Sequence, residues 1–364
     1  MEPIFIDDKL NKIYEKVKNK VRLDFDDGLY LYETKDLMGA GQIANCKRQS
    51  LHGKKSFFIY NQHLNYTNIC RNRCLFCAYA KDYCDNGSYQ YTMEDVEKEL
   101  TEKFDEPVNE IHMVGGLNEA LPYGYYIDLL KTIKKVRPNV TIKAFTAVEI
   151  DHLSNISGKS VEDVINELRE NGLEMMPGGG AEILSYRVHK KLFPRKINKD
   201  RWLEIIEKVH NSGITTNCTM LYGHIETVEE KVQHLVYLRD LQDRTNGFTA
   251  FIPLAFHSEN TRLSHIKETT AFEDLKNIIV SRLMLDNVPH IKAYWVMLGE
   301  KLAQTALHFG ADDLDGTILK EKITHSAGAK SAVGHAKETM IRLIEKAGMT
   351  AVERDAFYNE VKAG

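Results

Sequence analysis

Short apolar runs alternate with longer amphipathic stretches along most of the chain. A short apolar run between turn residues is typical of a buried strand, and apolar positions three and four residues apart are typical of a helix. The predicted strands cover residues 57–61 (extended towards 65), 110–114, 141–145, 173–176, 215–221, 249–254, 290–296 and 312–314. One predicted helix begins at Thr92, and the others cover residues 123–136, 160–171, 200–212, 227–242, 272–285, 301–309 and about 334–347.

Eight alternations of strand and helix predict parallel strands joined by helical crossovers. The count fits an α/β fold of the (βα)8 barrel type, and because the last strand is weak an incompletely closed barrel stays open as an alternative. Ile13, Val17 and Val21 have helical spacing and predict an N-terminal helical extension. We therefore expect an extension over residues 1–50, followed by a barrel with C-terminal helices over residues 51–364.

The composition is that of a globular protein, with 43% hydrophobic and 27% charged residues among 364. Lysine and arginine number 48, and aspartate and glutamate number 52, so the net charge is −4. This balance shows no basic stripe of the kind that nucleic-acid binding requires. No apolar run approaches the ~18 residues of a transmembrane helix, and the first residues lack the pattern of a signal peptide. We expect a cytoplasmic protein that binds neither nucleic acid nor membrane.

Cysteine is unevenly distributed, since four of the six cysteines lie within the fifteen residues from Cys70 to Cys84. In a cytoplasmic chain such clustering indicates metal or redox chemistry rather than disulfides. Cys70, Cys74 and Cys77 follow the first predicted strand with the spacing C-x3-C-x2-C. Because a cubane iron–sulfur cluster normally takes four thiolates, three in one loop predict a [4Fe–4S] cluster with one iron open to substrate. A structural zinc site, and a four-thiolate cluster completed by Cys84, stay as alternatives.

Other candidate residues also follow predicted strands, at the end of a parallel barrel where functional residues collect. They are Gly115 and Gly116 after the second strand, Glu149 after the third, Glu182 after the fourth, Gly223, His224 and Glu226 after the fifth, and His257 after the sixth. Glycines let the backbone approach a small ligand closely, and a simple tight turn is the alternative. For Glu182 and Glu226 the alternative is a place at a helix start.

The cysteine loop, with Phe76 before its third cysteine, resembles the cluster loop of radical S-adenosylmethionine enzymes. From about residue 55 to the C-terminus the chain resembles the aminofutalosine synthase family. The segments that carry this likeness are 63–79, 142–152, 177–182, 220–227, 251–257, 281–287 and 310–317. The cyclase of the same pathway usually has Ser-Pro-Pro-Glu where this chain has Thr146-Ala-Val-Glu149, and Trp-x-Phe-Gln where it has Leu254-Ala-Phe-His257. These differences favour the synthase family.

The resemblance implies a transferase of menaquinone biosynthesis by the futalosine pathway. Its expected cofactor is the [4Fe–4S] cluster, its co-substrate is S-adenosyl-L-methionine, and its substrate is 3-[(1-carboxyvinyl)oxy]benzoate. The 5′-deoxyadenosyl radical would add to the enol ether, and rearrangement with loss of CO2 or bicarbonate would give aminofutalosine. A flavodoxin- or ferredoxin-type protein is the expected electron donor, and a homodimer is compatible with the resemblance.

The resemblance also implies roles for the cofactor residues. The cluster ligands would be Cys70, Cys74 and Cys77. The residues expected to contact S-adenosylmethionine are Phe76, Gly115, Gly116, Glu149, Glu182, Gly223 and Glu226.

The substrate has two carboxylates, which call for cationic or strong donor groups. Our candidates are Arg282 and Lys143, with His257 and His224 as polar or proton-handling groups. For each of these residues a solvated surface position is the alternative. His63 and His112 alternate with apolar neighbours on predicted strands. This spacing allows them to point into the barrel, but we interpret them as satisfied buried histidines.

Overall fold

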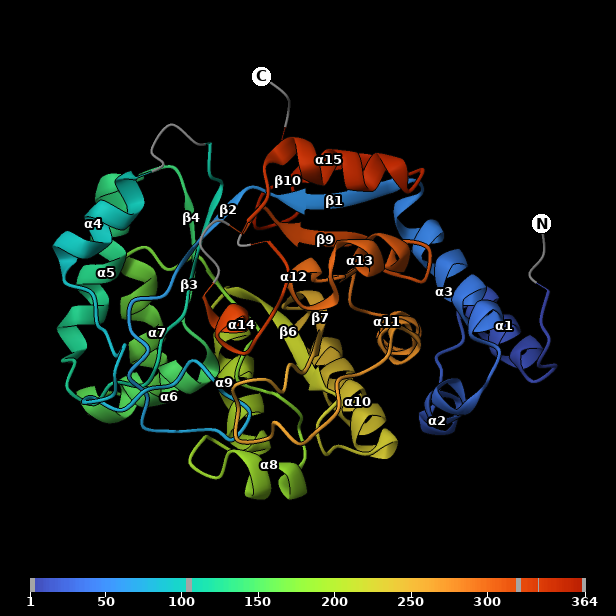
Figure 1. Cartoon of the computed structure of the whole chain (residues 1–364), viewed down its shortest axis with the longest axis horizontal. Coiled ribbons are helices and arrows are strands. Elements are labelled where there is room, and N and C mark those ends of the chain that lie inside the picture. Colours follow the sequence, from blue (N-terminus) through green and yellow to red (C-terminus); the bar gives the residue numbers. More distant parts are fainter. Residues whose placement is uncertain (1–3, 103–106, 319–321, 333, 362–364) are drawn as a thin grey trace.

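A curved sheet of parallel strands forms the centre of the computed structural model, which describes residues 4–102, 107–318, 322–332 and 334–361 (Figure 1). The seven strands of this sheet lie in the order β2-β3-β4-β5-β6-β7-β8, so each strand pairs with the next one along the chain. Their bounds are β2 Asn61–Leu64, β3 Glu110–Met113, β4 Thr141–Ala144, β5 Met175–Met176, β6 Thr215–Tyr222, β7 Phe248–Ala255 and β8 His290–Ile291. Because all these strands are parallel, their carboxyl ends meet at one mouth.

A second parallel sheet, with the order β10-β1-β9, lies beside the first. Its strands are β1 Lys55–Ile59, β9 Asp313–Gly316 and β10 Thr350–Arg354. The strand predicted over 57–65 is therefore two strands, β1 and β2, which belong to different sheets. The predicted eighth strand corresponds to β9, which pairs with β1 and is joined to β8 by an isolated bridge between Lys292 and Asp313. The predicted α/β barrel is thus confirmed as a partial barrel of seven strands within the described chain.

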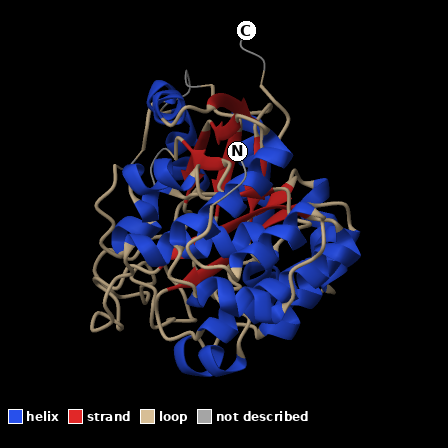
Figure 2. Cartoon of the chain, turned by 90° about the vertical axis from the view of Figure 1, so that its right-hand side faces the viewer, coloured by secondary structure: helices blue, strands red, loops and turns tan. Residues whose placement is uncertain are grey.

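The helices that connect the barrel strands cover the outer face of that sheet (Figures 1 and 2), whereas α14 lies at the carboxyl ends of the strands and α15 packs against β10 of the second sheet. Their bounds are α4 Met93–Thr101, α5 Tyr123–Val136, α6 Ala147–Ser157, α7 Val161–Glu170, α8 Tyr186–Leu192, α9 Lys199–Asn211, α10 Val228–Thr245, α11 Ala271–Met284, α12 Trp295–Leu298, α13 Glu300–Ala306, α14 Ile323–Ser326 and α15 Lys337–Lys346. The sequence pattern did not predict α6, α8 or β10, and the strand predicted over 290–296 ends at Ile291 because α12 follows it. In the described part of the chain no helix is long and apolar enough to cross a lipid bilayer.

Threonine residues set the starts of α4, α6, α10 and α11. In each case the threonine hydroxyl accepts a hydrogen bond from the backbone three residues later, and an acidic side chain at that position accepts one from the threonine N–H. The pairs are Thr92 with Asp95, Thr146 with Glu149, Thr227 with Glu230 and Thr270 with Glu273. This local pattern explains why three predicted starts, near residues 92, 227 and 272, lie within one residue of the observed ones.

The first described residues form three helices, so the helical character predicted for this part of the chain is confirmed. Their bounds are α1 Leu10–Lys18, α2 Phe25–Glu33 and α3 Leu37–His52. They pack against α10 and α11, on the right-hand side of Figure 1. A side chain at Gly28 would place its Cβ 2.8 Å from Val232 and 3.1 Å from Met284, so glycine allows α2 to approach both barrel helices closely.

Arg282 on α11 is completely buried and forms an ion pair with Asp312. Its Nε also donates to the Gly310 carbonyl (2.8 Å), and Nη1 donates to the Pro289 carbonyl (3.0 Å). Burial alone would raise the pKa of the Asp312 carboxyl, but Arg282 and His290 hold that pKa well below its ordinary value. The prediction that Arg282 binds substrate carboxylates is therefore wrong. Its charge instead ties α11 to the segment that enters β9.

We expect Arg282→Met to lower the free energy of unfolding by about 3–5 kcal/mol, because it leaves the buried Asp312 carboxylate without its partner. Urea unfolding followed by circular dichroism measures this change. The matched control is Arg244→Met, since Arg244 pairs with Glu207 on the surface with 53% of its side chain exposed; we expect it to cost less than about 1 kcal/mol. Equal urea midpoints for the two variants would contradict the structural role of Arg282.

Candidate active site

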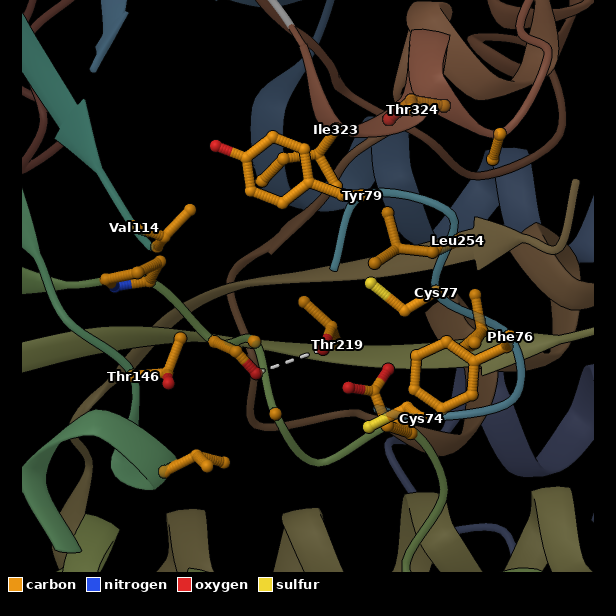
Figure 3. A pocket seen from close by; sticks show the side chains of 18 of the residues that line it. Cys74, Phe76, Cys77, Tyr79, Val114, Thr146, Thr219, Leu254, Ile323 and Thr324 are labelled. Atoms are coloured by element: carbon orange, nitrogen blue, oxygen red, sulfur yellow. Dashed lines mark hydrogen bonds between the residues drawn. The ribbon is translucent and has the colours of Figure 1, made fainter. Parts of the chain in front are cut away.

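A cavity of about 360 Å³ lies at the carboxyl ends of the barrel strands. Its volume is within the range of small-molecule sites. In Figure 3 the loop that carries Cys74 and Cys77 faces Val114 and Thr146 across the cavity, and Ile323 of α14 lies at a third side. The cavity is therefore built by loops that follow several barrel strands together with a segment near the C-terminus.

The loop after β2 brings three cysteines to this cavity. Its backbone is held by segments far along the chain, since Leu75 N–H donates to the Leu192 carbonyl (2.9 Å) and Arg262 N–H donates to the Leu75 carbonyl (3.1 Å). The end of α8 and the segment after β7 thus fix the conformation of the loop. The cavity-lining cysteines are Cys70, Cys74 and Cys77.

These thiols fit the ligand set of an iron–sulfur cluster. Cys74 is buried and Cys77 is half-buried. Burial raises the pKa of Cys74 to about 12 and raises the pKa of Cys77 above its ordinary value. Burial disfavours the charged thiolate, and a bound metal cation stabilises it, so such thiols ionise when a metal binds. Three thiols of one loop that face a common cavity therefore suit a [4Fe–4S] cluster with one iron open to the cavity.

Gly115 and Gly116 follow β3 and pack directly against the cysteine loop. A Cβ at Gly116 would lie 2.2 Å from the Ile69 carbonyl oxygen, and a Cβ at Gly115 would lie 2.4 Å from the Tyr66 ring. The Gly116 N–H donates to the Thr67 carbonyl (2.9 Å). Only glycine fits these positions, so the backbone after β3 lies against the cluster loop and faces the cavity.

Glu149 is 2% exposed and joins three parts of the cavity wall. Its carboxylate accepts hydrogen bonds from Tyr66 Oη (2.8 Å), from Gly115 N–H (3.1 Å) and from Thr146 N–H (2.7 Å). Burial raises the pKa of Glu149 even though these hydrogen bonds lower it. The same residue therefore caps α6 and positions the glycine turn after β3.

Glu182 and Lys196 form an ion pair beside the cysteine loop, and both line the cavity. Burial alone would lower the pKa of Lys196, but the neighbouring Glu182 carboxylate raises it above its ordinary value. The Lys196 ammonium also lies 5.5 Å from the centre of the Phe76 ring. Opposite charges next to the cluster loop can bind a zwitterion, whose ammonium and carboxylate each find a partner.

The sequence patterns of two protein families match the chain. The pattern of the radical SAM superfamily matches residues 64–238, and that of the CofH/MqnC C-terminal region matches residues 245–363. An aminodeoxyfutalosine synthase from Thermus thermophilus is 44% identical over 360 residues, which cover 98% of this chain and 97% of that relative. Another, from Streptomyces coelicolor, is 39% identical over 95% of this chain and 92% of its own length. The chain belongs to the aminodeoxyfutalosine synthase family of radical S-adenosylmethionine (SAM) enzymes.

The fold also resembles that of a solved structure. The crystal structure of methylornithine synthase (PylB) superposes with a TM-score of 0.70 over 93% of this chain and 97% of that one, at 18% identity. At this level of identity the likeness concerns the fold. It agrees with a radical SAM partial barrel that carries the cluster loop after its first strand.

The structure brings most of the predicted cofactor residues of this radical SAM family together. Phe76 is one of them, and its ring meets Phe193 edge-on at 5.8 Å between centres. His257 also lines the cavity, with Nε2 3.0 Å from the Met297 carbonyl oxygen. What each residue contacts when ligands are bound stays a prediction. The predicted residues in the cavity lining are Cys70, Cys74, Phe76, Cys77, Gly115, Gly116, Glu149, Glu182 and His257.

Gly223, His224 and Glu226 lie outside this lining, in a turn after β6. Glu226 accepts hydrogen bonds from Gly223 N–H (2.6 Å) and His224 N–H (2.9 Å), so its carboxylate holds the turn. The His224 side chain is completely buried, and its Nε2 lies 3.0 Å from the Leu221 carbonyl oxygen. The structure therefore contradicts a proton-handling role for His224 in the cavity, because its buried ring contacts the backbone of its own turn and does not line the cavity.

The structure also contradicts the prediction that Lys143 on β4 binds a substrate carboxylate. Lys143 is 3% exposed, lies outside the cavity lining, and its ammonium is 3.2 Å from Glu110. Its positive charge is neutralised by this buried carboxylate, so it does not bind a substrate carboxylate directly.

His63 and His112 both line the cavity, in the orientation into the barrel that their alternation with apolar neighbours had left open. Sequence reasoning missed two charged residues of the lining. Lys196 and Asp315 carry no such signal, because one lies between two helices and the other lies in the second sheet.

Cys84 is exposed and is absent from the described cavity lining. This placement disfavours a four-cysteine cluster. We expect Cys84→Ala to keep the iron and sulfide content of the anaerobically reconstituted protein, because its thiol lies outside the cavity. Cys77→Ala should lose most of both, since a cluster ligand is removed. Iron and sulfide analysis with the absorbance near 400 nm, a region typical of such clusters, measures both variants. Loss of the cluster in Cys84→Ala would restore the alternative.

Gly116→Ala should disrupt the approach of the β3 turn to the cluster loop, since its Cβ would overlap the Ile69 carbonyl. We expect reduced cluster retention and at least about 10-fold weaker SAM binding, the effect of losing roughly one or two hydrogen bonds. Iron analysis and equilibrium dialysis with labelled SAM measure these quantities. The matched control is Gly124→Ala on α5, where nothing lies within 4 Å of the added methyl group. Unchanged SAM binding in Gly116→Ala would show that the close approach is dispensable.

Proposed function

We propose that the protein is an aminodeoxyfutalosine synthase. In this reaction the 5′-deoxyadenosyl group of SAM is joined to 3-[(1-carboxyvinyl)oxy]benzoate, and methionine and CO2 or bicarbonate are released. The observation that carries the proposal is a three-cysteine loop at the mouth of a radical SAM barrel in a chain with full-length similarity to such synthases.

The proposed chemistry starts from the sulfonium of SAM. A bound [4Fe–4S] cluster supplies the electron that breaks the carbon–sulfur bond, which gives methionine and the 5′-deoxyadenosyl radical. The radical carbon adds to the terminal carbon of the enol ether. The new carbon radical attacks the ring carbon that carries the ether oxygen, and the aryl C–O bond breaks. The resulting oxygen-centred radical expels the carboxyl group as the CO2 radical anion while the ketone forms, and one-electron oxidation of this anion, for which the oxidised cluster would be the acceptor, gives CO2. The adenosyl group stays in the product, so SAM is consumed.

The protein's own residues bind and orient the reactants. Lys196 and Glu182 offer opposite charges to the methionine carboxylate and ammonium, and the backbone at Gly115 and Gly116 approaches the same group. Apolar side chains from β6 and β7, among them Leu221 and Leu254, line the rest of the mouth. An apolar wall excludes water, which protects radical intermediates from side reactions.

The proposal extends to the partners of the enzyme. The reaction needs one low-potential electron per cleavage, and a flavodoxin- or ferredoxin-type protein is the proposed donor. Cluster formation requires reduced thiols, which a reducing compartment maintains. We therefore propose a cytoplasmic location.

An anaerobic assay of the reconstituted protein with dithionite, SAM and 3-[(1-carboxyvinyl)oxy]benzoate tests the proposed function. We expect aminodeoxyfutalosine by mass spectrometry, and SAM labelled in the adenosyl group should transfer that label to the product. Cys77→Ala serves as the inactive control. Release of free 5′-deoxyadenosine without the adduct would contradict the synthase and favour a hydrogen-abstracting relative such as the pathway's cyclase.

A further inference from the structure

Two histidine rings lie side by side in the deep part of the cavity. His63 on β2 and His112 on β3 are directly opposite each other in the parallel register. Their ring centres are 4.7 Å apart with the planes inclined by 26°, so the rings stack. Both come from within strands, whereas Cys70 and Gly116 come from the loops that follow the same two strands. The histidine pair therefore lies below the cluster loop, towards the interior of the barrel.

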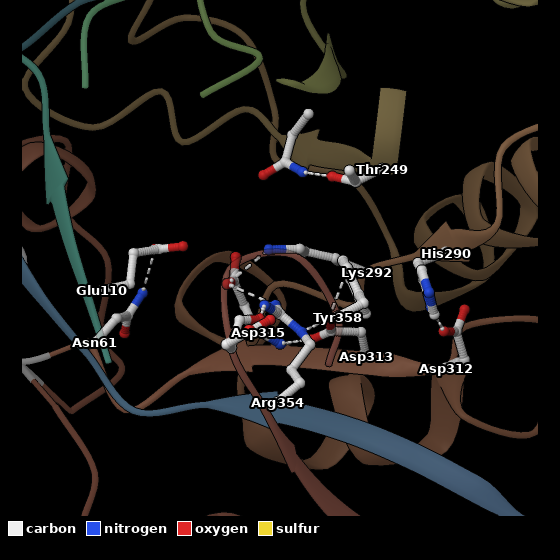
Figure 4. Close-up of polar contacts among 12 residues, drawn as sticks. Asn61, Glu110, Thr249, His290, Lys292, Asp312, Asp313, Asp315, Arg354 and Tyr358 are labelled. Atoms are coloured by element: carbon white, nitrogen blue, oxygen red, sulfur yellow. Dashed lines mark hydrogen bonds and ion pairs between the residues drawn. The ribbon is translucent and has the colours of Figure 1, made fainter. Parts of the chain in front are cut away.

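The charges beneath this histidine pair are already balanced. Glu110 is 3.2 Å from the Lys143 ammonium. Asp315 is 2.9 Å from the Lys292 ammonium (Figure 4). The Glu110 carboxylate lies 3.9 Å from His112 Nδ1. Asp315, which also lines the cavity, is thus neutralised by a lysine and does not leave this end of the cavity negative.

The pKa of His112 lies well below its ordinary value because of burial, with His63 and Lys143 adding to the effect. The ring is therefore neutral before ligand binding. A neutral imidazole carries one N–H donor and one acceptor nitrogen. Because both rings line the cavity and stack on each other, a carboxylate placed at their edges can meet a ring nitrogen of each.

Some other polar groups of the described lining have partners of their own. Lys196 is paired with Glu182 next to the cysteines. Asn217 donates to Thr249 Oγ1 (2.8 Å), and Thr219 donates to the Gly178 carbonyl (3.0 Å). The histidine pair is a donor set of the lining that lies within the strands rather than in the cysteine loop.

The proposed substrate has two carboxylates with different fates. The carboxylate on the enol ether is bonded to the carbon next to the one that the adenosyl radical attacks, so it lies near the adenosyl group. It leaves during the reaction, and strong hydrogen bonds to it would oppose its departure. The ring carboxylate is meta to the ether oxygen, lies farther from the attacked carbon, and stays in the product.

We propose that His63 and His112 form the subsite for the ring carboxylate of the substrate, with one N–H donated to each oxygen. This subsite rests on the proposed function for the identity of its ligand. It positions the aryl group so that the carbon radical meets the ring carbon bearing the ether oxygen. His63 and His112 are thus substrate-binding residues that set specificity for an aryl carboxylate.

Binding without turnover tests this subsite. The cluster-loaded protein with SAM and no reductant is titrated with 3-[(1-carboxyvinyl)oxy]benzoate and with 2-phenoxyprop-2-enoate, which lacks the ring carboxylate. We expect His112→Phe, which keeps the stacked ring but removes both nitrogens, to weaken binding of the full substrate roughly 10- to 100-fold, as for loss of a hydrogen bond to a charged group. It should change binding of the analogue less than about 3-fold, because the analogue already lacks the ring carboxylate with which His112 would interact.

His63→Phe should behave like His112→Phe, and His112→Gln, which restores a donor, should recover part of the affinity. His308→Phe is the matched control, because His308 is exposed and contacts the Ala347 carbonyl far from the cavity. Iron content and SAM binding should stay at the wild-type level in all four variants. Equal losses with both ligands would overturn the proposal, because a merely structural role weakens both.

A third ligand, 3-(ethenyloxy)benzoate, keeps the ring carboxylate and lacks the other one. The histidine variants should weaken its binding as they weaken binding of the full substrate. If they affect only ligands that carry the enol carboxylate, the assignment is wrong. Failure of the proposed function is a separate result: the wild-type protein would then bind the ring carboxylate through these histidines and still form no aminodeoxyfutalosine under reducing conditions.

Discussion

The geometry of the barrel depends on a buried ion pair, Lys292 with Asp315, that joins the two sheets, and on two further pairs that lie within the sheets. Lys143 pairs with Glu110 in the barrel sheet, and Arg354 pairs with Asp313 in the second sheet. All six side chains are buried, and Figure 4 shows the pairs of Lys292 and Arg354. Backbone pairing between β8 and β9 is limited to an isolated bridge, so the Lys292–Asp315 pair supplies a contact that strand pairing does not. Burial alone would raise the pKa of Glu110, but Lys143 lowers it, so the carboxylate stays charged. Three cations matched by three anions make such burial tolerable, whereas any one left alone would be costly.

This network explains why the cavity has distinct ends. Lys143 on β4 and Lys292 just after β8 are paired with carboxylates and lie outside the described cavity lining, whereas His63 and His112 line the cavity. At the other end, the cysteine loop is fixed by Leu192 and Arg262 and lies against glycines after β3. The proposed reaction needs this difference, because one end must hold a cluster and a zwitterion and the other must hold an aromatic acid.

Several features of the fold and site followed from local sequence. Threonine caps placed the starts of α4, α10 and α11, and the spacing of Cys70, Cys74 and Cys77 predicted a shared metal site that the cavity supports. Arg282 shows where local reasoning failed. A lone arginine on an amphipathic helix looks available for a ligand, but its partner Asp312 comes thirty positions later, at the start of another sheet. No periodicity in the chain reveals that pairing.

The sequence by itself determined the alternation of strands and helices, the three-cysteine loop and the family, because each depends on residues close together in the chain or on motifs read in order. Only the tertiary structure decided that β1 and β9 leave the barrel for a second sheet, and that His63 and His112 rather than Arg282 and Lys143 face the cavity. The physical reason is that a charged side chain faces a cavity or a partner according to which distant carboxylate neutralises it, and that choice is made only when the sheets come together.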